Sequence, residues 1–259
     1  MNIQIPGAAS ARSLTLQRIT AAVESACVAT FPEDPLLTTA LSRLTSVCGS
    51  VVKRHGPLLE GAIADALESS GRYVVLRRMR LPVTAEGRAL VTAGRHCEEV
   101  RTLDRIESWA DADLVVVDER TGHLLALQIK RGGGKTDAKK RRLIERDLLA
   151  ARTTCRAYFA QQSPELDVRS CEVRIVDVYG GSGFDPAMTI LGTELDMAFE
   201  LPIAAWITAT TSTLRAALEA VLPELVEPVL ATLGAPAADG VRPSRSRADL
   251  LGIPQSSEL

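Results

Sequence analysis

The feature that most constrains this chain is an apolar segment that doubles back on itself, "ADLVVVDERTGHLLALQIK", residues 112–130. Its first part, "DLVVVD", is almost continuously apolar, as expected for a strand buried on both faces of a sheet. "DERTG" is rich in turn-forming residues, and "HLLALQIK" has the composition of a second strand. The segment therefore predicts a β-hairpin with its loop at 119–122 and with Asp118 opposite His123.

This register brings three polar side chains to the open end of the hairpin. Asp113 then lies opposite Gln128, with Cβ atoms about 5 Å apart. Lys130 is two residues beyond Gln128 and points to the same face. The neighbouring acid, Asp111, falls outside the pair. An acid, an amide oxygen and an ammonium gathered at one point suit a divalent cation beside a phosphate, since Mg²⁺ prefers oxygen ligands and keeps several waters.

A fourth polar group comes from the segment before the strands, "PLLEGAIADALESSG", which predicts a helix over 57–71. Its apolar face contains Leu59, Ile63 and Leu67. At 100° per residue, Glu60 lies about 20° from Leu67 around the helix. An unpaired carboxylate near a buried face is costly, so we expect a metal ion or a lysine beside Glu60.

Together these residues resemble the motif of the PD-(D/E)xK nuclease superfamily, which includes restriction endonucleases, archaeal Holliday-junction resolvases and Mrr-type enzymes. "GPLLEGAIADAL" is similar to their first core helix, and the hairpin to their motif hairpin, so the resemblance covers roughly residues 56–180. It implies an α/β, restriction-endonuclease-like αβββαβ core with a mixed sheet and an Mg²⁺- or Mn²⁺-dependent phosphodiesterase site.

Carried over by position, the resemblance implies roles for individual residues. Glu60, Asp113 and Gln128 would be metal ligands, and Asp113, Gln128 and Lys130 would be the catalytic residues. The chain departs from the motif at two places. Ala112 stands where a proline often precedes the acid, and Gln128 replaces the usual Glu or Asp, as in Mrr-like members. The second departure weakens the compensation of the metal charge, and the superfamily also contains members that have lost activity.

The glycines after the hairpin, in "GGGKT", look like the phosphate loop of a nucleotide hydrolase. That motif requires a glycine five residues before Gly134, where Ile129 stands. The spacing argues against a nucleoside-triphosphate site. We expect instead a flexible exit from the strand, with Thr136 or Asp137 capping a helix over 137–160.

Basic residues dominate the start of that helix. Lys139, Arg142 and Arg146 follow the spacing i, i+3, i+7 and share one face. Beside a metal site, such a stripe would bind the phosphates of a nucleic acid; the alternative is a solvated face, partly paired with Glu145 and Asp147. The residues expected to contact nucleic acid are Arg131, Lys135, Lys139, Arg142 and Arg146.

The pattern of the whole chain predicts four parts: a helical N-terminal extension over 1–55, an α/β core over 56–210, a C-terminal helical segment over 211–234 and a disordered tail over 235–259. "HGP" at 55–57 should separate two helices. Within the core we expect strands over 72–83, 171–180 and 201–210, and irregular structure over 84–110. Pro223 and Pro228 should kink or divide the C-terminal helix.

Composition narrows the class of protein. A formal net charge of −2 argues against coating nucleic acid through overall charge, although a local basic patch stays open. The five cysteines form no CxxC pair, which favours reduced thiols in the cytoplasm over disulfides or a zinc site. The chain contains no uninterrupted apolar stretch of about 20 residues, so we expect no membrane association.

The first functional hypothesis is therefore a metal-dependent nuclease that cleaves phosphodiester bonds in DNA, with RNA left open as a substrate. A catalytically inactive nucleic-acid-binding protein or scaffold on the same fold is the second hypothesis, and Gln128 is the residue that sustains it. A third hypothesis is a protein–protein adaptor that docks through its N-terminal helices. The sequence also leaves open whether the chain forms a homodimer.

Overall fold

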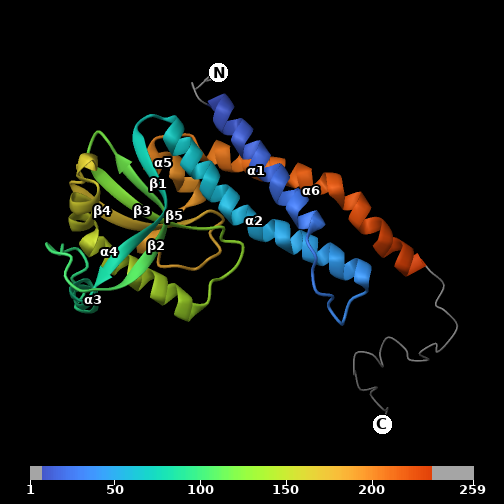
Figure 1. Cartoon of the computed structure of the whole chain (residues 1–259), viewed down its shortest axis with the longest axis horizontal. Coiled ribbons are helices and arrows are strands. Elements are labelled where there is room, and N and C mark those ends of the chain that lie inside the picture. The colour runs from blue at the N-terminus through green and yellow to red at the C-terminus, as the bar shows by residue number, and fades with distance from the viewer. Residues whose placement is uncertain (1–7, 235–259) are drawn as a thin grey trace, which may run out of the picture.

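The computed structural model describes residues 8–234 and is built around a five-stranded mixed sheet (Figure 1). The strands lie in chain order and are β1 (Tyr73–Thr84), β2 (Ile106–Asp118), β3 (His123–Lys130), β4 (Ser170–Asp177) and β5 (Thr189–Leu191). β1, β2 and β3 pair antiparallel, whereas β4 runs parallel to both β3 and β5. The chain is thus a mixed α/β protein, as the sequence predicts.

Helices cover both faces of the sheet (Figure 1). The α-helices are α1 (Ala8–Val28), α2 (Thr39–Ser69), α3 (Ala85–Thr92), α4 (Ala138–Gln162), α5 (Leu195–Phe199) and α6 (Ile203–Gly234). Single turns of 3₁₀ helix are η1 (Pro164–Leu166), η2 (Pro186–Met188) and η3 (Gly192–Glu194). α4 packs on one face of the sheet, and α2, α5 and the start of α6 pack on the other.

The central hairpin is buried on both faces, which explains its continuous apolar run. Val115 and Val117 of β2 pack on the α4 side, with Leu148 among their partners. Leu114 and Val116 face the opposite way, into the core formed with α2. Removing apolar surface from water contributes roughly 25 cal/mol per Å², so burial on two faces fixes the hairpin at the centre of the sheet.

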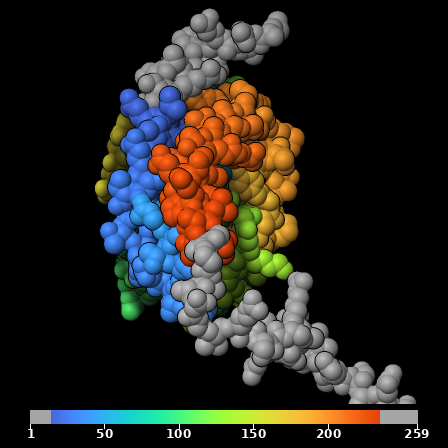
Figure 2. Space-filling model, turned by 90° about the vertical axis from the view of Figure 1, so that its right-hand side faces the viewer, coloured from blue at the N-terminus to red at the C-terminus, as the bar shows by residue number. Residues whose placement is uncertain are grey.

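A third core lies beyond the sheet. Apolar side chains of α1, α2 and the middle of α6 pack together, among them Ile19, Val23, Val47, Val51 and Leu214. Figures 1 and 2 show these three helices side by side, and Figure 1 shows that they extend away from the sheet. The N-terminal extension and the C-terminal helical segment expected from the sequence therefore form one helical unit.

The hairpin register expected from the sequence is confirmed. Asp118 pairs with His123, and Leu114 pairs with Leu127. The loop occupies 119–122 and closes with Gly122 at a φ of +67°. A Cβ atom at Gly122 would meet the Arg169 side chain at 2.9 Å, so both the backbone angle and the space require glycine.

The predicted helix break at 55–57 is wrong. α2 runs without interruption from Thr39 to Ser69 with Pro57 inside it. Proline in a helix interior removes one hydrogen bond and costs about 3 kcal/mol. Here both halves are anchored, the first by Val47 and Val51 in the third core and the second by buried residues against the sheet. The boundary drawn at residue 55 therefore falls inside a continuous helix.

Three other expectations about local structure are also corrected. Residues 201–210 form no strand but begin α6, because Ile203, Ile207 and Leu214 follow helical spacing and are buried. The region 84–110, expected to be irregular, contains α3, whose N-cap Thr84 accepts a hydrogen bond from the Gly87 N–H at 3.1 Å. Pro223 and Pro228 lie inside α6 without dividing it.

The predicted tail over 235–259 lies outside the described residues. Within residues 8–234, none of the helices combines the length and the apolar character needed to cross a bilayer.

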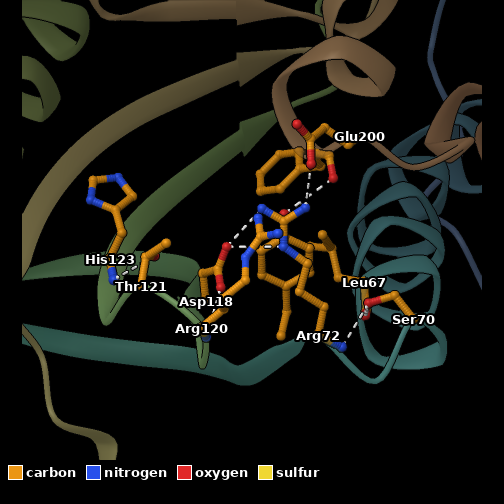
Figure 3. Close-up of polar contacts among 10 residues, drawn as sticks. Leu67, Ser70, Arg72, Asp118, Arg120, Thr121, His123 and Glu200 are labelled. Atoms are coloured by element: carbon orange, nitrogen blue, oxygen red, sulfur yellow. Dashed lines mark hydrogen bonds and ion pairs between the residues drawn. The ribbon is translucent and has the colours of Figure 1, made fainter.

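An ion cluster fastens the turn end of the hairpin to the helical layer (Figure 3). Arg72 donates from Nε and Nη2 to Oδ2 of Asp118 at 2.9 and 2.7 Å, and from Nη1 to Glu200 at 2.6 Å. Asp118 is buried, and burial raises its pKa. The hydrogen bonds and charge of Arg72, together with the backbone N–H groups of Arg120 and Thr121, outweigh this effect and hold the pKa below its ordinary value. The cluster ties β2 to the loop between α5 and α6.

We expect Arg72→Met to destabilise the fold by about 1–3 kcal/mol, because it leaves the buried Asp118 carboxylate without its cation. Since the folded-state pKa of Asp118 is lowered, the stabilisation is present above its unfolded pKa of about 3.9 and disappears as the pH falls through the folded value. Urea unfolding at pH 7 and pH 3 measures both effects. The exposed Arg101→Met is the control, and an equal loss in both variants at pH 7 would contradict the assignment.

Candidate functional site

The alternation of side chains in β2 breaks at Asp113. Ala112 and Val115 both pack on the α4 side, although residues three apart point to opposite faces of a regular strand. Leu114 packs on the α2 side. Asp113 and Leu114, which are consecutive, both line a cavity next to α2. The break thus turns an acidic side chain toward the helical layer, next to the point where β2 and β3 stop pairing.

β1 carries a matching break at Arg78. Its φ of +54° lies in the left-handed region, which is unfavourable for residues other than glycine. Leu76 and Met79, on either side of the break, both pack toward α4. The residues flanking Arg78 pair with the residues flanking Asp113. The two strands therefore change face together, and Arg78 and Asp113 lie across from each other.

Hydrogen bonds from β3 fix the Asp113 carboxylate. Its Oδ2 accepts the Ile129 backbone N–H at 2.5 Å and the Gln128 side-chain amide. The backbone pairing of β2 and β3 ends at Leu114 and Leu127. Beyond that pair, the Asp113 carboxylate is the acceptor for the backbone of β3. Within the described residues Oδ1 accepts no hydrogen bond from the protein.

Glu60 of α2 approaches the same point from the helical layer. Glu60 and Asp113 line one open cavity of about 680 Å³ between α1, α2, β1 and β2. Burial raises the pKa of Glu60, and the negative charge of Asp113 raises it further, against the opposing influence of Arg78 and Lys130. The predicted nearness of Glu60 to the hairpin acid is therefore observed, and the two carboxylates repel each other.

Lys130 completes the group at the end of β3. Burial lowers the pKa of its ammonium, while the charges of Asp113 and Glu60 act in the opposite direction. Burial also raises the pKa of Asp113, against the hydrogen bond from Ile129 and the charge of Lys130. An amine and two carboxylates thus share a half-buried site in which each charged form is disfavoured by the loss of water.

These oxygen atoms suit a hard divalent cation that takes few of its ligands from the protein. Glu60 and the free Oδ1 of Asp113 offer two anionic oxygens. Among the described residues, no cluster of three or more His, Cys, Asp or Glu side chains could hold a metal ion. Mg²⁺ is commonly held by one or two carboxylates and completes its shell with waters and substrate phosphates. Gln128 directs its amide nitrogen to Asp113, so its role here is to orient the acid.

The basic residues expected to bind nucleic acid lie in two different places. Lys139, Arg142 and Arg146 are exposed on α4 or at its edge, where Arg146 contacts Asp147 at 3.4 Å. Glu145 instead accepts a hydrogen bond from the backbone of Asp185 at 2.9 Å. Lys135 is exposed in the glycine loop, whereas Arg131 turns toward α2. None of the five lines the cavity of Glu60 and Asp113.

The glycine loop is fastened to the neighbouring loop and is not a free exit from the strand. The Tyr179 N–H donates to the Arg131 carbonyl at 3.1 Å, and the Gly181 N–H donates to that of Gly132 at 3.1 Å. Gly132 has a φ of +74°, and a Cβ atom there would collide with the carboxylate of Asp177. Asp137 caps α4 as predicted, accepting the N–H groups of residues 139 and 140.

His55 of α2 is buried beside the site, and nothing in the sequence singled it out. Nδ1 of His55 accepts from Nε of Arg131 at 3.2 Å, and its Nε2 lies 3.2 Å from Oγ1 of Thr211. An arginine can only donate, so Nδ1 carries no proton and Nε2–H is the donor to Thr211. The Arg131 guanidinium also lies 5.8 Å from the centre of the Tyr179 ring. His55 therefore holds Arg131 in place next to Lys130.

Two arginines of the cavity, Arg18 and Arg54, were not singled out from the sequence. Both come from the N-terminal extension, and Arg54 directly precedes the "HGP" segment that suggested a helix break. Because α2 continues through Pro57, the N-terminal extension lies beside the sheet, and its two arginines line the cavity of the acids. No local motif in the sequence indicates this.

Comparison of the chain with protein-family models, curated proteins and solved structures finds no match in any of the three. The function proposed for this protein therefore rests on its own residues and their geometry.

We expect His55 to stay neutral, with its proton on Nε2, at a pH where a free imidazole is half protonated. Burial and the charge of Arg131 lower its pKa, below the ordinary value of about 6.5. Nitrogen-15 NMR of the imidazole rings checks both points, with His55→Gln used to assign the signals. A proton on Nδ1, or a pKa above 6.5, would contradict the hydrogen bond from Arg131.

The lowered pKa also fixes the sign of the pH dependence. The unfolded chain binds a proton at His55 more readily than the folded chain does. Stability due to neutral His55 is therefore complete above about pH 6.5 and declines as the pH falls below it.

Proposed function

We propose that this protein is a metal-dependent nuclease that hydrolyses phosphodiester bonds, with DNA as the favoured substrate and RNA as the alternative. One observation carries the proposal. Two carboxylates from different layers, Glu60 and Asp113, share an arginine-lined cavity next to the half-buried amine of Lys130. A fold gains no stability from bringing two half-buried acids together. A cation bound between them would offset their repulsion and would explain why they lie together.

Glu60 and Asp113 would hold the Mg²⁺ or Mn²⁺ ion, with Asp113 kept in position by Gln128 and the Ile129 N–H. When bound, the ion would lower the pKa of a coordinated water and offset the charge of the scissile phosphate. The hydrogen bonds from β3 occupy Oδ2 of Asp113, so its remaining oxygen has a fixed direction. A preorganised ligand needs no rearrangement during the reaction.

Lys130 would act on the phosphate or on the attacking water. Its ammonium is close enough to Asp113, Glu60 and Lys140 for their charges to act on its pKa. A charged amine fixed there offsets the negative charge that develops on the phosphate oxygens. Partial burial strengthens this electrostatic effect, because water screens it less.

The second candidate function is that of a protein on the same fold that binds nucleic acid without cutting it. Gln128 is the observation that favours it, since an amide supplies no charge to balance a divalent cation. The basic stripe of α4, Lys139, Arg142 and Arg146, remains available as a nucleic-acid surface under either function. Binding without cleavage on every substrate would support this alternative.

The test is cleavage of supercoiled, linear, branched and single-stranded DNA and of structured RNA, each with Mg²⁺, Mn²⁺ or EDTA. We expect cleavage that requires the metal ion. Asp113→Asn and Lys130→Met should each lower the rate by about 100-fold or more, the loss typical of removing a group that stabilises charge in the transition state.

Asp111→Asn is the matched control, because Asp111 is exposed, lies two residues from Asp113 and has a single ion pair within residues 8–234, with Arg80 at 3.8 Å. Its rate should equal that of the wild type. Cleavage that persists in EDTA, or that survives both Asp113→Asn and Lys130→Met, would exclude this site as the catalytic centre.

A further inference from the structure

The cavity that contains Glu60 and Asp113 is richer in arginine than a metal site requires. Four guanidinium groups line it, from α1, α2 and β1: Arg18, Arg54, Arg77 and Arg78. The lining itself carries four positive charges against two carboxylates, and further acids lie just outside it. A concave surface with an excess of one charge raises the local concentration of ligands of the opposite sign. Guanidinium groups bind phosphate oxygens well, so the lining suits a phosphate-bearing ligand.

Two of the four arginines are already neutralised by the protein. Arg18 pairs with Asp65 at 3.2 Å, and Arg77 pairs with the same acid at 2.7 Å and with Glu68 at 2.9 Å. Asp65 is buried, so these pairs have a structural role in joining α1 and β1 to α2. They are not the charges that remain to bind a ligand.

The other two arginines keep their charge available. Arg54 donates to the hydroxyls of Ser50 and Ser25, the latter at 3.1 Å, and these partners carry no charge. Arg78 forms no ion pair with any other described residue, and its side chain lines the cavity opposite Asp113. These two guanidiniums, one from the N-terminal extension and one from the sheet, are the charges of the lining that form no ion pair with a described acid.

The backbone of Arg78 adds a second line of argument. Glycine adopts its φ of +54° more easily than arginine does. Residues held in such conformations gather at functional sites, where the surrounding structure fixes them. Here the paired strands on both sides of Arg78 fix the angle, and the result is a guanidinium turned to the acids.

We propose that Arg54 and Arg78 bind the phosphate backbone of a nucleic-acid strand and deliver it to Glu60 and Asp113. The N-terminal helices then form one wall of the substrate site, and the strand enters between α1, α2 and the β1–β2 break. The inference rests on the proposed function. It assigns the substrate to the arginine cavity, and not to the basic stripe on α4.

Binding can be measured without catalysis. Fluorescence anisotropy in EDTA would follow a DNA strand of about 20 nucleotides, its duplex and the corresponding RNA, over a range of salt concentrations. The cavity variant is Arg54→Ala with Arg78→Gly. Glycine removes the guanidinium and relieves the left-handed backbone, so the second change should leave the fold intact. Thermal melting verifies that the variant is folded.

The cavity variant should bind at least about 10-fold more weakly, because it cannot make two of the phosphate contacts. The slope of log K against log salt should fall by roughly two, since each phosphate that the protein neutralises adds about one to the slope. Arg54→Lys with Arg78→Lys keeps both charges and should retain most of the slope. Arg156→Ala with Arg169→Ala removes the same charge from exposed ion pairs and should bind as the wild type does.

The competing site is tested by Lys139→Ala with Arg142→Ala on α4. A loss of binding confined to this variant, a loss equal to that of the cavity variant, or no binding by the wild type would each overturn the inference. Failure of the nuclease proposal can be told apart from failure of this inference. The wild type would then bind nucleic acid through the cavity but would not cleave it in Mg²⁺ or Mn²⁺.

Discussion

The hydrogen bond from the Ile129 N–H to Asp113 is the interaction on which the arrangement of the site depends. At this point a carboxylate replaces a backbone carbonyl as the acceptor from β3, and the backbone pairing of the central hairpin ends. A buried N–H without a partner would cost about 1–3 kcal/mol, so the acid is needed by the fold as well as by the proposed chemistry. The paired breaks at Arg78 and Asp113 turn both side chains toward α2.

α2 connects this break to the rest of the molecule. Its second half packs on the sheet and supplies Glu60, while its first half belongs to the core shared with α1 and α6. Because the helix continues through Pro57, the two halves cannot move as independent units joined by a loop. The extension is thereby fixed relative to the acids, and Arg54 lines their cavity from the same helix as Glu60.

The hairpin, its register and the capping of α4 by Asp137 could be predicted because local patterns determine them. Helical spacing placed Glu60 beside the buried face of its helix, and the resemblance to the nuclease motif put it with Asp113. Other features depend on tertiary packing. The sequence around Pro57 and the start of α6 both favour local structures that burial overrides. The left-handed Arg78 has no sequence signature, since an arginine there looks like any other strand residue.

The central claim, that Glu60 and Asp113 form a cation site, is tested most directly by comparing the stability of the wild type and Glu60→Gln with and without Mg²⁺. In EDTA the two acids repel, so Glu60→Gln should be the more stable protein by up to about 1 kcal/mol. Mg²⁺ at about 100 times its dissociation constant should stabilise the wild type by about 2.7 kcal/mol and reverse the order. A Glu60→Gln variant that is less stable in EDTA, or that gains as much from Mg²⁺ as the wild type does, would contradict the claim.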